Sequence, residues 1–187
     1  MVCAALLLAW RLDKEHPVKL DKALNLALEF EHKVHDHYAN GAKAIRDPQG
    51  SKVFATLARE EQGHVDFLNA MLAEWTRTGR VRPTPLKSIL PTPKWVKEAL
   101  DRHRKIATRR VGDKNDIELL KTALQMEKEA CSFYTGMVDK LGADERVLFE
   151  PFLEIEAGHL AVVQCELDAV QGLGFWFDVQ EFALEAG

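Results

Sequence analysis

Two short motifs in the sequence each place a carboxylate three residues before an imidazole: Glu-Gln-Gly-His at 61–64 and Glu-Ala-Gly-His at 156–159. Residues three apart on a helix share a face, so each motif directs a carboxylate and a ring nitrogen to the same side. A single copy is common on exposed helix faces. Two copies indicate a metal site in the core, because both lie among apolar residues such as Leu57, Leu68, Phe152 and Val163.

About 30 residues before each motif there is another glutamate, and a tyrosine follows that glutamate seven residues later. The pairs are Glu31 with Tyr38 and Glu127 with Tyr134, and the chain has no other tyrosine. Seven residues make about two helical turns, so the members of a pair also share a face. The glutamate-to-glutamate spacing is 30 residues in the first half and 29 in the second. We therefore predict an internal helix-hairpin repeat that brings four glutamates and two histidines to one level of the core.

Charge favours metal binding at this level. Burying one carboxylate costs several kcal/mol unless its charge is compensated, and two divalent cations would neutralise four glutamates. Oxygen-rich ligation with one imidazole per metal suits iron or manganese, and di-iron carboxylate bundles use this combination of Glu and Glu-x-x-His helices. The predicted metal ligands are Glu31, Glu61, His64, Glu127, Glu156 and His159.

The elements that position these residues are predicted to be helices, because apolar residues recur at helical spacing and no long stretch alternates with period two. Asp47-Pro48 is typical of an N-cap followed by proline, and Thr92-Pro93 indicates a short helix within a long, proline-rich link. A link of that length lets the second and third helices run parallel. The prediction is one all-α domain, residues 1–187, with helices at about 20–45, 48–77, 116–141 and 144–171, a crossover at 78–115 and an aromatic tail at 172–187.

Composition excludes several other classes. A chain of 187 residues can fold without disulfides, and three cysteines with no CxxC pair exclude a zinc ribbon and a four-thiolate iron site. A net charge of −4 is unlike that of a nucleic-acid binder. The apolar run at 1–10 is shorter than the ~20 residues of a membrane span and lacks the basic start of a signal peptide. We expect a cytoplasmic protein without a membrane span.

The six-ligand pattern resembles the ferritin-like superfamily and, within it, the rubrerythrin-like di-iron proteins, over about residues 20–171. The resemblance implies a ferritin-like four-helix bundle with a long crossover between its second and third helices, and two iron ions per chain, with manganese as the other metal considered. The roles that it implies are terminal carboxylates at Glu31 and Glu127, bridging carboxylates at Glu61 and Glu156, one nitrogen ligand per iron at His64 and His159, and tyrosine hydroxyls that hold a glutamate across the site at Tyr38 and Tyr134.

The chain departs from rubrerythrins at two points. It has no paired CxxC motifs, so we expect no C-terminal rubredoxin domain, and Ala130 stands where rubrerythrins carry a further glutamate on the third helix. The resemblance implies an oxidoreductase that reduces hydrogen peroxide, or O2, with electrons from an external rubredoxin- or ferredoxin-like protein. The alternatives are a ferroxidase or other iron-handling protein, a dimanganese catalase, and a hydroxylase of a lipid-like substrate.

His35 and Cys131 stand four residues after Glu31 and Glu127, at equivalent positions of the repeat. Both are predicted to line the site, where the functional interpretation is a proton donor at His35 and a redox-sensitive thiol at Cys131, and the role of Cys131 stays open. Ordinary packing beside the site is the alternative for each residue.

Two segments indicate partners. Residues 77–114 hold 12 Lys and Arg against three Asp and Glu, a net charge of +9, so the rest of the chain carries −13. This predicts contact with an acidic bundle surface or a docking patch for an acidic electron carrier. The aromatic tail and the apolar run at 1–10 offer surface that usually marks an interface, so we expect at least a homodimer.

Overall fold

The computed structural model describes residues 19–103 and 113–172, and within these ranges it contains five helices and no strand. The all-α class expected from the sequence is confirmed. The apolar run at 1–10 and the aromatic tail from residue 173 onward lie outside the described residues. The helices are α2 Leu20–Ala44, α3 Pro48–Thr78, α4 Pro93–His103, α5 Lys114–Lys140 and α6 Ala143–Val170.

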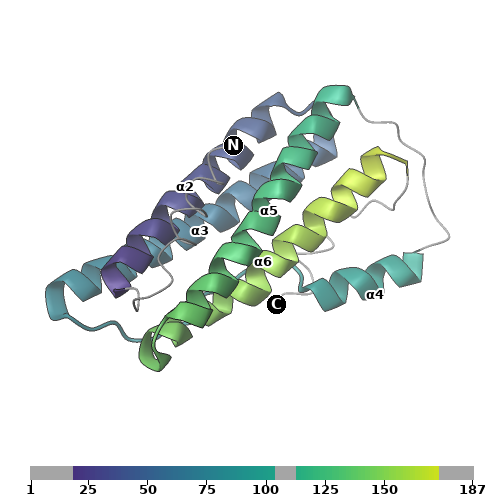
Figure 1. Cartoon of the computed structure of the whole chain (residues 1–187). Helices are drawn as coiled ribbons and strands as arrows, with labels where there is room; N and C mark the ends of the chain where they lie inside the picture. The colour runs from purple at the N-terminus through teal and green to yellow at the C-terminus, as the bar shows by residue number, and fades with distance from the viewer. Residues whose placement is uncertain (1–18, 104–112, 173–187) are drawn as a thin grey trace.

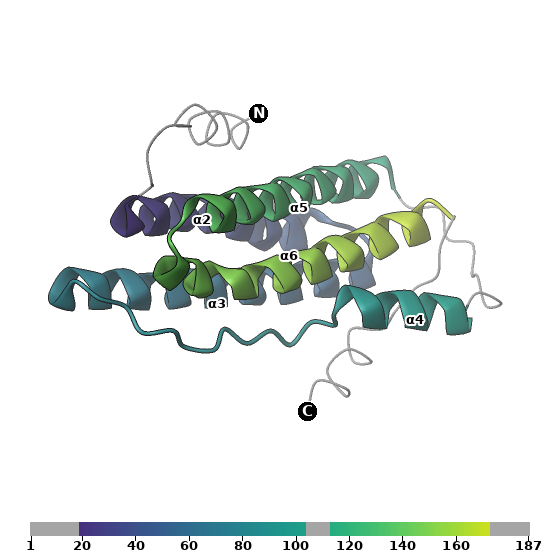
Figure 2. The same cartoon turned by 60° about the horizontal axis from the view of Figure 1, so that its bottom comes forward.

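The four long helices lie side by side as a bundle, while the crossover and α4 run along its outside (Figure 1). Helices α2 and α3 form one antiparallel hairpin, and α5 and α6 form the other. The crossover returns the chain to the starting end of α3, so α3 and α5 run in the same direction (Figure 2). Contacts between α2 and α5 join the two hairpins, and α4 packs on α6. The expected bundle with a long crossover between its second and third helices is thus confirmed.

The turn between α2 and α3 is fixed by two aspartates. The side chain of Asp47 caps α3 by accepting a hydrogen bond from the Gly50 N–H at 2.9 Å, and Pro48 occupies the first helical position. Asp116, buried in the first turn of α5, accepts hydrogen bonds from the backbone N–H groups of Arg46 and Asp47 at 2.9 and 3.0 Å. The second hairpin is therefore bonded to the turn of the first hairpin. This contact fixes how the two hairpins are aligned along the bundle and so which residues of each lie opposite one another.

The crossover begins with a turn that favours glycine and ends on a capped helix. Gly79 follows α3 with φ +66°, a left-handed conformation that ends the helix. Helix α4 begins at Pro93, and the Thr92 hydroxyl accepts a hydrogen bond from the Trp95 N–H at 3.3 Å. Between these points the chain passes so close to α6 that a Cβ added to Gly158 would lie 2.8 Å from the carbonyl oxygen of Pro91.

Aromatic stacking fills the core where the hairpins meet. Phe30 of α2 and Phe133 of α5 stack with ring centroids 5.1 Å apart, and Tyr134 of α5 stacks on Phe152 of α6 at 4.3 Å. All four side chains are fully buried. This packing excludes water from the level of the predicted ligands. No helix in the described part of the chain is long and apolar enough to cross a membrane.

Candidate metal centre

The structure brings the six predicted ligands together in the middle of the bundle, and each is at most 1% exposed. One ligand atom from each residue forms two groups in which all atoms lie within 4.8 Å of one another. Glu61 and Glu156 belong to both groups. The groups are Glu31, Glu61, His64 and Glu156, and Glu61, Glu127, Glu156 and His159. The arrangement therefore offers two adjacent four-residue sites joined by two shared carboxylates.

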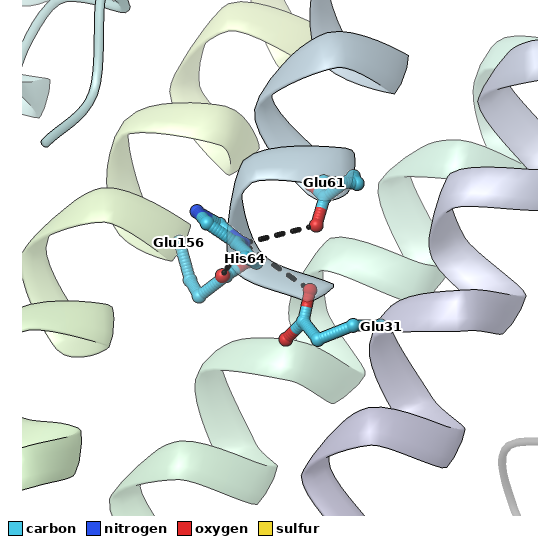
Figure 3. A group of neighbouring side chains, drawn as sticks. All are labelled: Glu31, Glu61, His64 and Glu156. Carbon is cyan, nitrogen blue, oxygen red and sulfur yellow. Dashed lines mark hydrogen bonds and ion pairs between the residues drawn. The ribbon is translucent and has the colours of Figure 1, made fainter. Parts of the chain in front are cut away.

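Figure 3 shows the first group, in which three helices direct carboxylates at one imidazole nitrogen. The Nδ1 atom of His64 lies 3.2 Å from Glu31 Oε2, 3.1 Å from Glu61 Oε2 and 3.3 Å from Glu156 Oε1. Glu61 and His64 share a face of α3 because they are three residues apart. Glu31 comes from α2 and Glu156 from α6, so packing of both hairpins is needed to complete the group.

The second group has the same composition as the first, but the second hairpin supplies three of its four residues. Nδ1 of His159 lies 2.9 Å from Glu61 Oε1 and 3.7 Å from Glu156 Oε2, and Glu127 of α5 completes the set. The imidazole rings of His64 and His159 lie nearly parallel, with centroids 5.4 Å apart. The two rings therefore enter the centre from adjacent helices with the same nitrogen pointing inward.

Each buried tyrosine donates a hydrogen bond to a glutamate of the other hairpin that belongs to one group only. Tyr38 of α2 donates to Glu127 of α5, and Tyr134 of α5 donates to Glu31 of α2. Burial, followed by the nearby carboxylates, raises the pKa of both tyrosines well above 10, so each hydroxyl keeps its proton at neutral pH. The exchange fixes the orientation of both glutamates and couples the hairpins.

Burial and mutual repulsion make three of the four carboxyl groups weak acids. Burial raises the pKa of Glu31 to about 8, with Glu61 as the next cause, and raises that of Glu127 to about 7. The pKa of Glu156 is also raised well above its ordinary value, first by burial and then by Glu61. Without cations, the centre therefore holds protons on carboxyl groups at neutral pH.

Glu61, at the centre of the cluster, shifts in the opposite direction. Burial alone would raise its pKa, but His64 and His159 together lower it well below its ordinary value. Burial would lower the pKa of each histidine, but Glu61 and the other nearby carboxylates together raise it well above 6.5. The cluster thus compensates its own charge with protons, and cations would take over this role on binding.

The donor set fits two divalent cations. Among the residues that the structure describes, buried side-chain atoms that lack a hydrogen bond gather at this level, and they include ligand atoms of Glu61, Glu127, Glu156 and His159. Buried polar atoms are normally satisfied, so such a gathering indicates that something else binds there. Four carboxylates and two imidazoles suit iron or manganese. The buried Glu and His cluster is able to hold metal ions.

Sequence reasoning missed Glu60, which lies immediately outside the cluster. Its carboxylate Oε2 stands 3.8 Å from Nε2 of His159, opposite the inward-pointing nitrogen. It also accepts hydrogen bonds from the Ser88 hydroxyl and, at 3.3 Å, from the Ile89 N–H of the crossover. Burial would raise the pKa of Glu60, but these partners together lower it. Glu60 stands one residue before the first motif and so on another face of α3, and only knowledge of the crossover's path would have singled it out.

His35 and Cys131 flank the cluster without joining either group of ligand atoms. Nδ1 of His35 lies 3.2 Å from Oδ1 of the neighbouring Asp36, and the His35 side chain is a quarter exposed. Burial, with Glu156 and Glu127, raises the pKa of the half-buried Cys131 thiol to about 11. A thiol that keeps its proton at neutral pH is a poor nucleophile, which favours ordinary packing for Cys131.

Comparison with known proteins gives one match. The family model described as Rubrerythrin matches residues 22–167, a stretch that includes all six residues of the cluster and both tyrosines. No curated protein and no solved structure matches the chain.

Proposed function

The chain belongs to the rubrerythrin family, a ferritin-like di-iron family, and we propose that it is an oxidoreductase that reduces hydrogen peroxide with electrons from an external donor. The observation that carries this proposal is the sharing of Glu61 and Glu156 between two buried groups of ligand atoms. Shared carboxylates would hold two metal ions next to each other, and two one-electron centres together would supply the two electrons that one peroxide takes.

We assign iron to the centre because the family and the oxygen-rich donor set agree with it. Two ferrous ions held by this cluster would supply the two electrons that reduce hydrogen peroxide to two molecules of water. Glu31 and Glu127 would bind as terminal ligands, Glu61 and Glu156 as bridges, and each histidine through Nδ1. Manganese remains the alternative metal, as in a dimanganese catalase.

The chain's own contribution is orientation and exclusion of water. Tyr38 and Tyr134 hold the terminal glutamates through hydrogen bonds that cross between the hairpins. The buried rings of Phe30, Phe133 and Phe152 close the core around these glutamates. The carboxylates would therefore stay in place when the charge of the bound metal ions changes. Such a preorganised site limits the rearrangement that accompanies each change of oxidation state.

The setting of the protein belongs to the same proposal. An external rubredoxin- or ferredoxin-like protein would supply electrons, and the chain would act as a homodimer in the cytoplasm against oxidative stress. Light scattering tests the dimer, since a monomeric mass for the intact chain would contradict it.

The decisive experiment compares two oxidants. The protein is loaded anaerobically with ferrous iron, about two ions per chain, and mixed in a stopped-flow device with hydrogen peroxide or with O2. We expect oxidation by peroxide to be at least about tenfold faster. Faster oxidation by O2 would overturn the proposal in favour of a ferroxidase or oxygenase. The buried Ala130, which offers no carboxylate, is the observation that favours this second candidate.

A matched pair of variants assigns the reaction to the centre. Glu127→Ala removes a ligand, whereas Glu129→Ala removes a half-exposed carboxylate two residues away on another face of α5. Fast oxidation should be lost in the first variant and kept in the second. Equal rates in both variants would show that iron outside the cluster reacts.

A further inference from the structure

The crossover carries exposed positive charge, most of which forms no ion pair within the described residues. Within the described residues, the cations from Arg77 to Lys97 are exposed, and the one ion pair among them joins Lys94 to Glu98 at 4.0 Å. The side-chain charges of the remaining five have no acidic partner within 4 Å in that part of the chain, although the backbone N–H of Arg82 donates to Glu74 at 3.4 Å. These five cations are Arg77, Arg80, Arg82, Lys87 and Lys97. Direct pairing with the acidic bundle therefore does not account for this charge.

An apolar side chain stands within this basic stretch. Ile89 is 47% exposed, and it is one of two large hydrophobic residues in the described part of the chain that face solvent to this extent. Lys87 stands two residues before it and is also exposed. An exposed apolar residue beside unpaired cations is typical of a docking surface, where the apolar group anchors and the charges steer.

The same stretch connects to the metal centre. The Ser88 hydroxyl and the Ile89 N–H both donate to Glu60, whose Oε2 lies 3.8 Å from Nε2 of His159. Nδ1 of His159 is the nitrogen that faces the shared carboxylates. The route from the exposed Ile89 to a ligand of the centre therefore passes through a single intervening side chain, Glu60. Figure 2 shows this stretch of the crossover on the outer side of the bundle.

We propose that the crossover surface formed by Arg80, Arg82, Lys87 and Ile89 is the docking site for a small acidic iron–sulfur protein, which passes electrons to the metal centre through the Glu60–His159 contact. The charge of the surface selects an acidic partner, because opposite charges speed encounter and like charges exclude the wrong one. The inference rests on the proposed function, since it locates the external donor which that function needs.

The electron count follows from one-electron steps. Reduction of one hydrogen peroxide breaks its O–O bond and consumes two electrons and two protons to give two molecules of water. The iron–sulfur partner gives one electron per encounter and leaves oxidised, so two encounters restore the centre after each peroxide. The protons come from solvent.

The test uses a small acidic [2Fe–2S] ferredoxin as the probe and the intact iron-loaded chain. Calorimetry measures binding of the oxidised ferredoxin, and stopped-flow absorbance follows oxidation of the reduced ferredoxin when peroxide is present. The double variant Arg82→Glu/Lys87→Glu reverses two surface charges. The matched control Lys52→Glu/Lys128→Glu makes the same change at exposed lysines of α3 and α5 that have no ion pair in the described part of the chain. Each ferredoxin rate is divided by the same variant's rate with dithionite.

We expect the crossover variant to weaken binding and slow the normalised rate by at least about tenfold, and the control to change both by less than about twofold. Raising the salt concentration from about 20 mM to about 300 mM should remove most of the difference. Equal losses in the two variants, or no binding to the wild type at low salt, would overturn the docking site. If dithionite supports no peroxide reduction, the proposed function fails, while calorimetry still decides whether this surface binds the acidic protein.

Discussion

The two hairpins present equivalent ligands to the metal centre but differ in what covers them. Gly63 precedes His64 on α3 and Gly158 precedes His159 on α6, so the repeat extends to these glycines. A Cβ at Gly63 would meet nothing within 4 Å, whereas one at Gly158 would meet the Pro91 carbonyl oxygen at 2.8 Å. The crossover therefore covers one half of a nearly symmetric centre and leaves the equivalent place on the other half open.

The histidines show the same difference. Nε2 of His159 has the carboxylate of Glu60 at 3.8 Å, whereas Nε2 of His64 has no carboxylate within 4 Å in the described part of the chain, and neither nitrogen makes a hydrogen bond there. The residue of α6 that corresponds to Glu60 in the repeat is Ile155. A carboxylate behind a ligand histidine fixes the ring and increases its basicity. The repeat thus sets the ligands, and the crossover makes the two metal positions unequal.

Removing a shared ligand should have the largest effect. Glu61→Ala or Glu156→Ala should reduce bound iron from about two ions per chain to nearly none, because each carboxylate belongs to both groups. Glu31→Ala or Glu127→Ala should leave about one ion, since each belongs to one group. Elemental analysis of protein loaded without oxygen measures the content, with circular dichroism to verify folding. Retention of two ions by Glu61→Ala would contradict the shared roles.

The response to pH should differ between the metal-free and the loaded protein. The folded pKa values of Glu31, about 8, and Glu127, about 7, lie above the ordinary 4.5. A raised folded pKa stabilises the fold below pH 4.5, and this contribution is lost as pH rises through the folded value. The lowered pKa of Glu61 acts in the opposite sense, but its contribution is complete above about pH 4.5. The metal-free protein should therefore become steadily less stable between about pH 5 and pH 8.5, and the raised pKa values of Glu156, His64 and His159 act in the same direction.

Denaturant unfolding at several pH values tests this expectation. Loaded protein should show no such loss, because bound cations replace the protons. Glu31→Gln should flatten the metal-free profile more than Glu127→Gln, since Glu31 has the higher pKa. A metal-free protein whose stability rises over this range would contradict the assigned shifts.

Glu60 faces only one of the two histidines and should therefore make the two metal positions differ in affinity. Glu60→Ala removes the group that faces His159, so affinity at the second position should fall by about 10- to 100-fold while the first changes little. Ile155→Ala, at the equivalent place on α6, is the matched control and should leave both affinities within a few-fold. Titration with ferrous iron, followed by optical spectra, resolves the two steps. Equal weakening of both positions by Glu60→Ala would mean that the crossover does not distinguish them.

The paired glycines test the covering directly. Gly158→Ala places a methyl group against the backbone of Pro91, so the crossover must move, at a cost of about 1–3 kcal/mol in stability. Gly63→Ala meets open space and should stabilise α3 by up to about 1 kcal/mol through helix propensity. Thermal unfolding should shift in opposite directions for the two variants. A shift in the same direction for both variants would contradict the proposed difference in how the crossover covers the two helices.

The six residues that the spacing singled out as ligands gather in one buried cluster, because the helical period converts spacing into position. Glu31 and Tyr38, or Glu61 and His64, share a face whatever surrounds them. The same period predicted the four helices and, from the length of the link, the parallel second and third helices. Spacing contains nothing about which long-range neighbour lies behind a residue. Glu60 was missed for this reason, since its role depends on Ser88 and Ile89, 28 and 29 residues away in a segment without periodicity.

The smallest effects are expected beside the centre, where the repeat places His35 and Cys131 at equivalent positions. His35→Ala should slow oxidation by peroxide by less than about tenfold, because this side chain is a quarter exposed and bonds to Asp36, so water can replace it as a proton donor. Cys131→Ser should leave the rate unchanged, since the raised pKa of about 11 keeps the thiol protonated. Stopped-flow oxidation of both loaded variants at neutral pH gives the comparison. An unchanged rate in His35→Ala would remove His35 from the mechanism, and a slower Cys131→Ser would show that the thiol takes part despite its pKa.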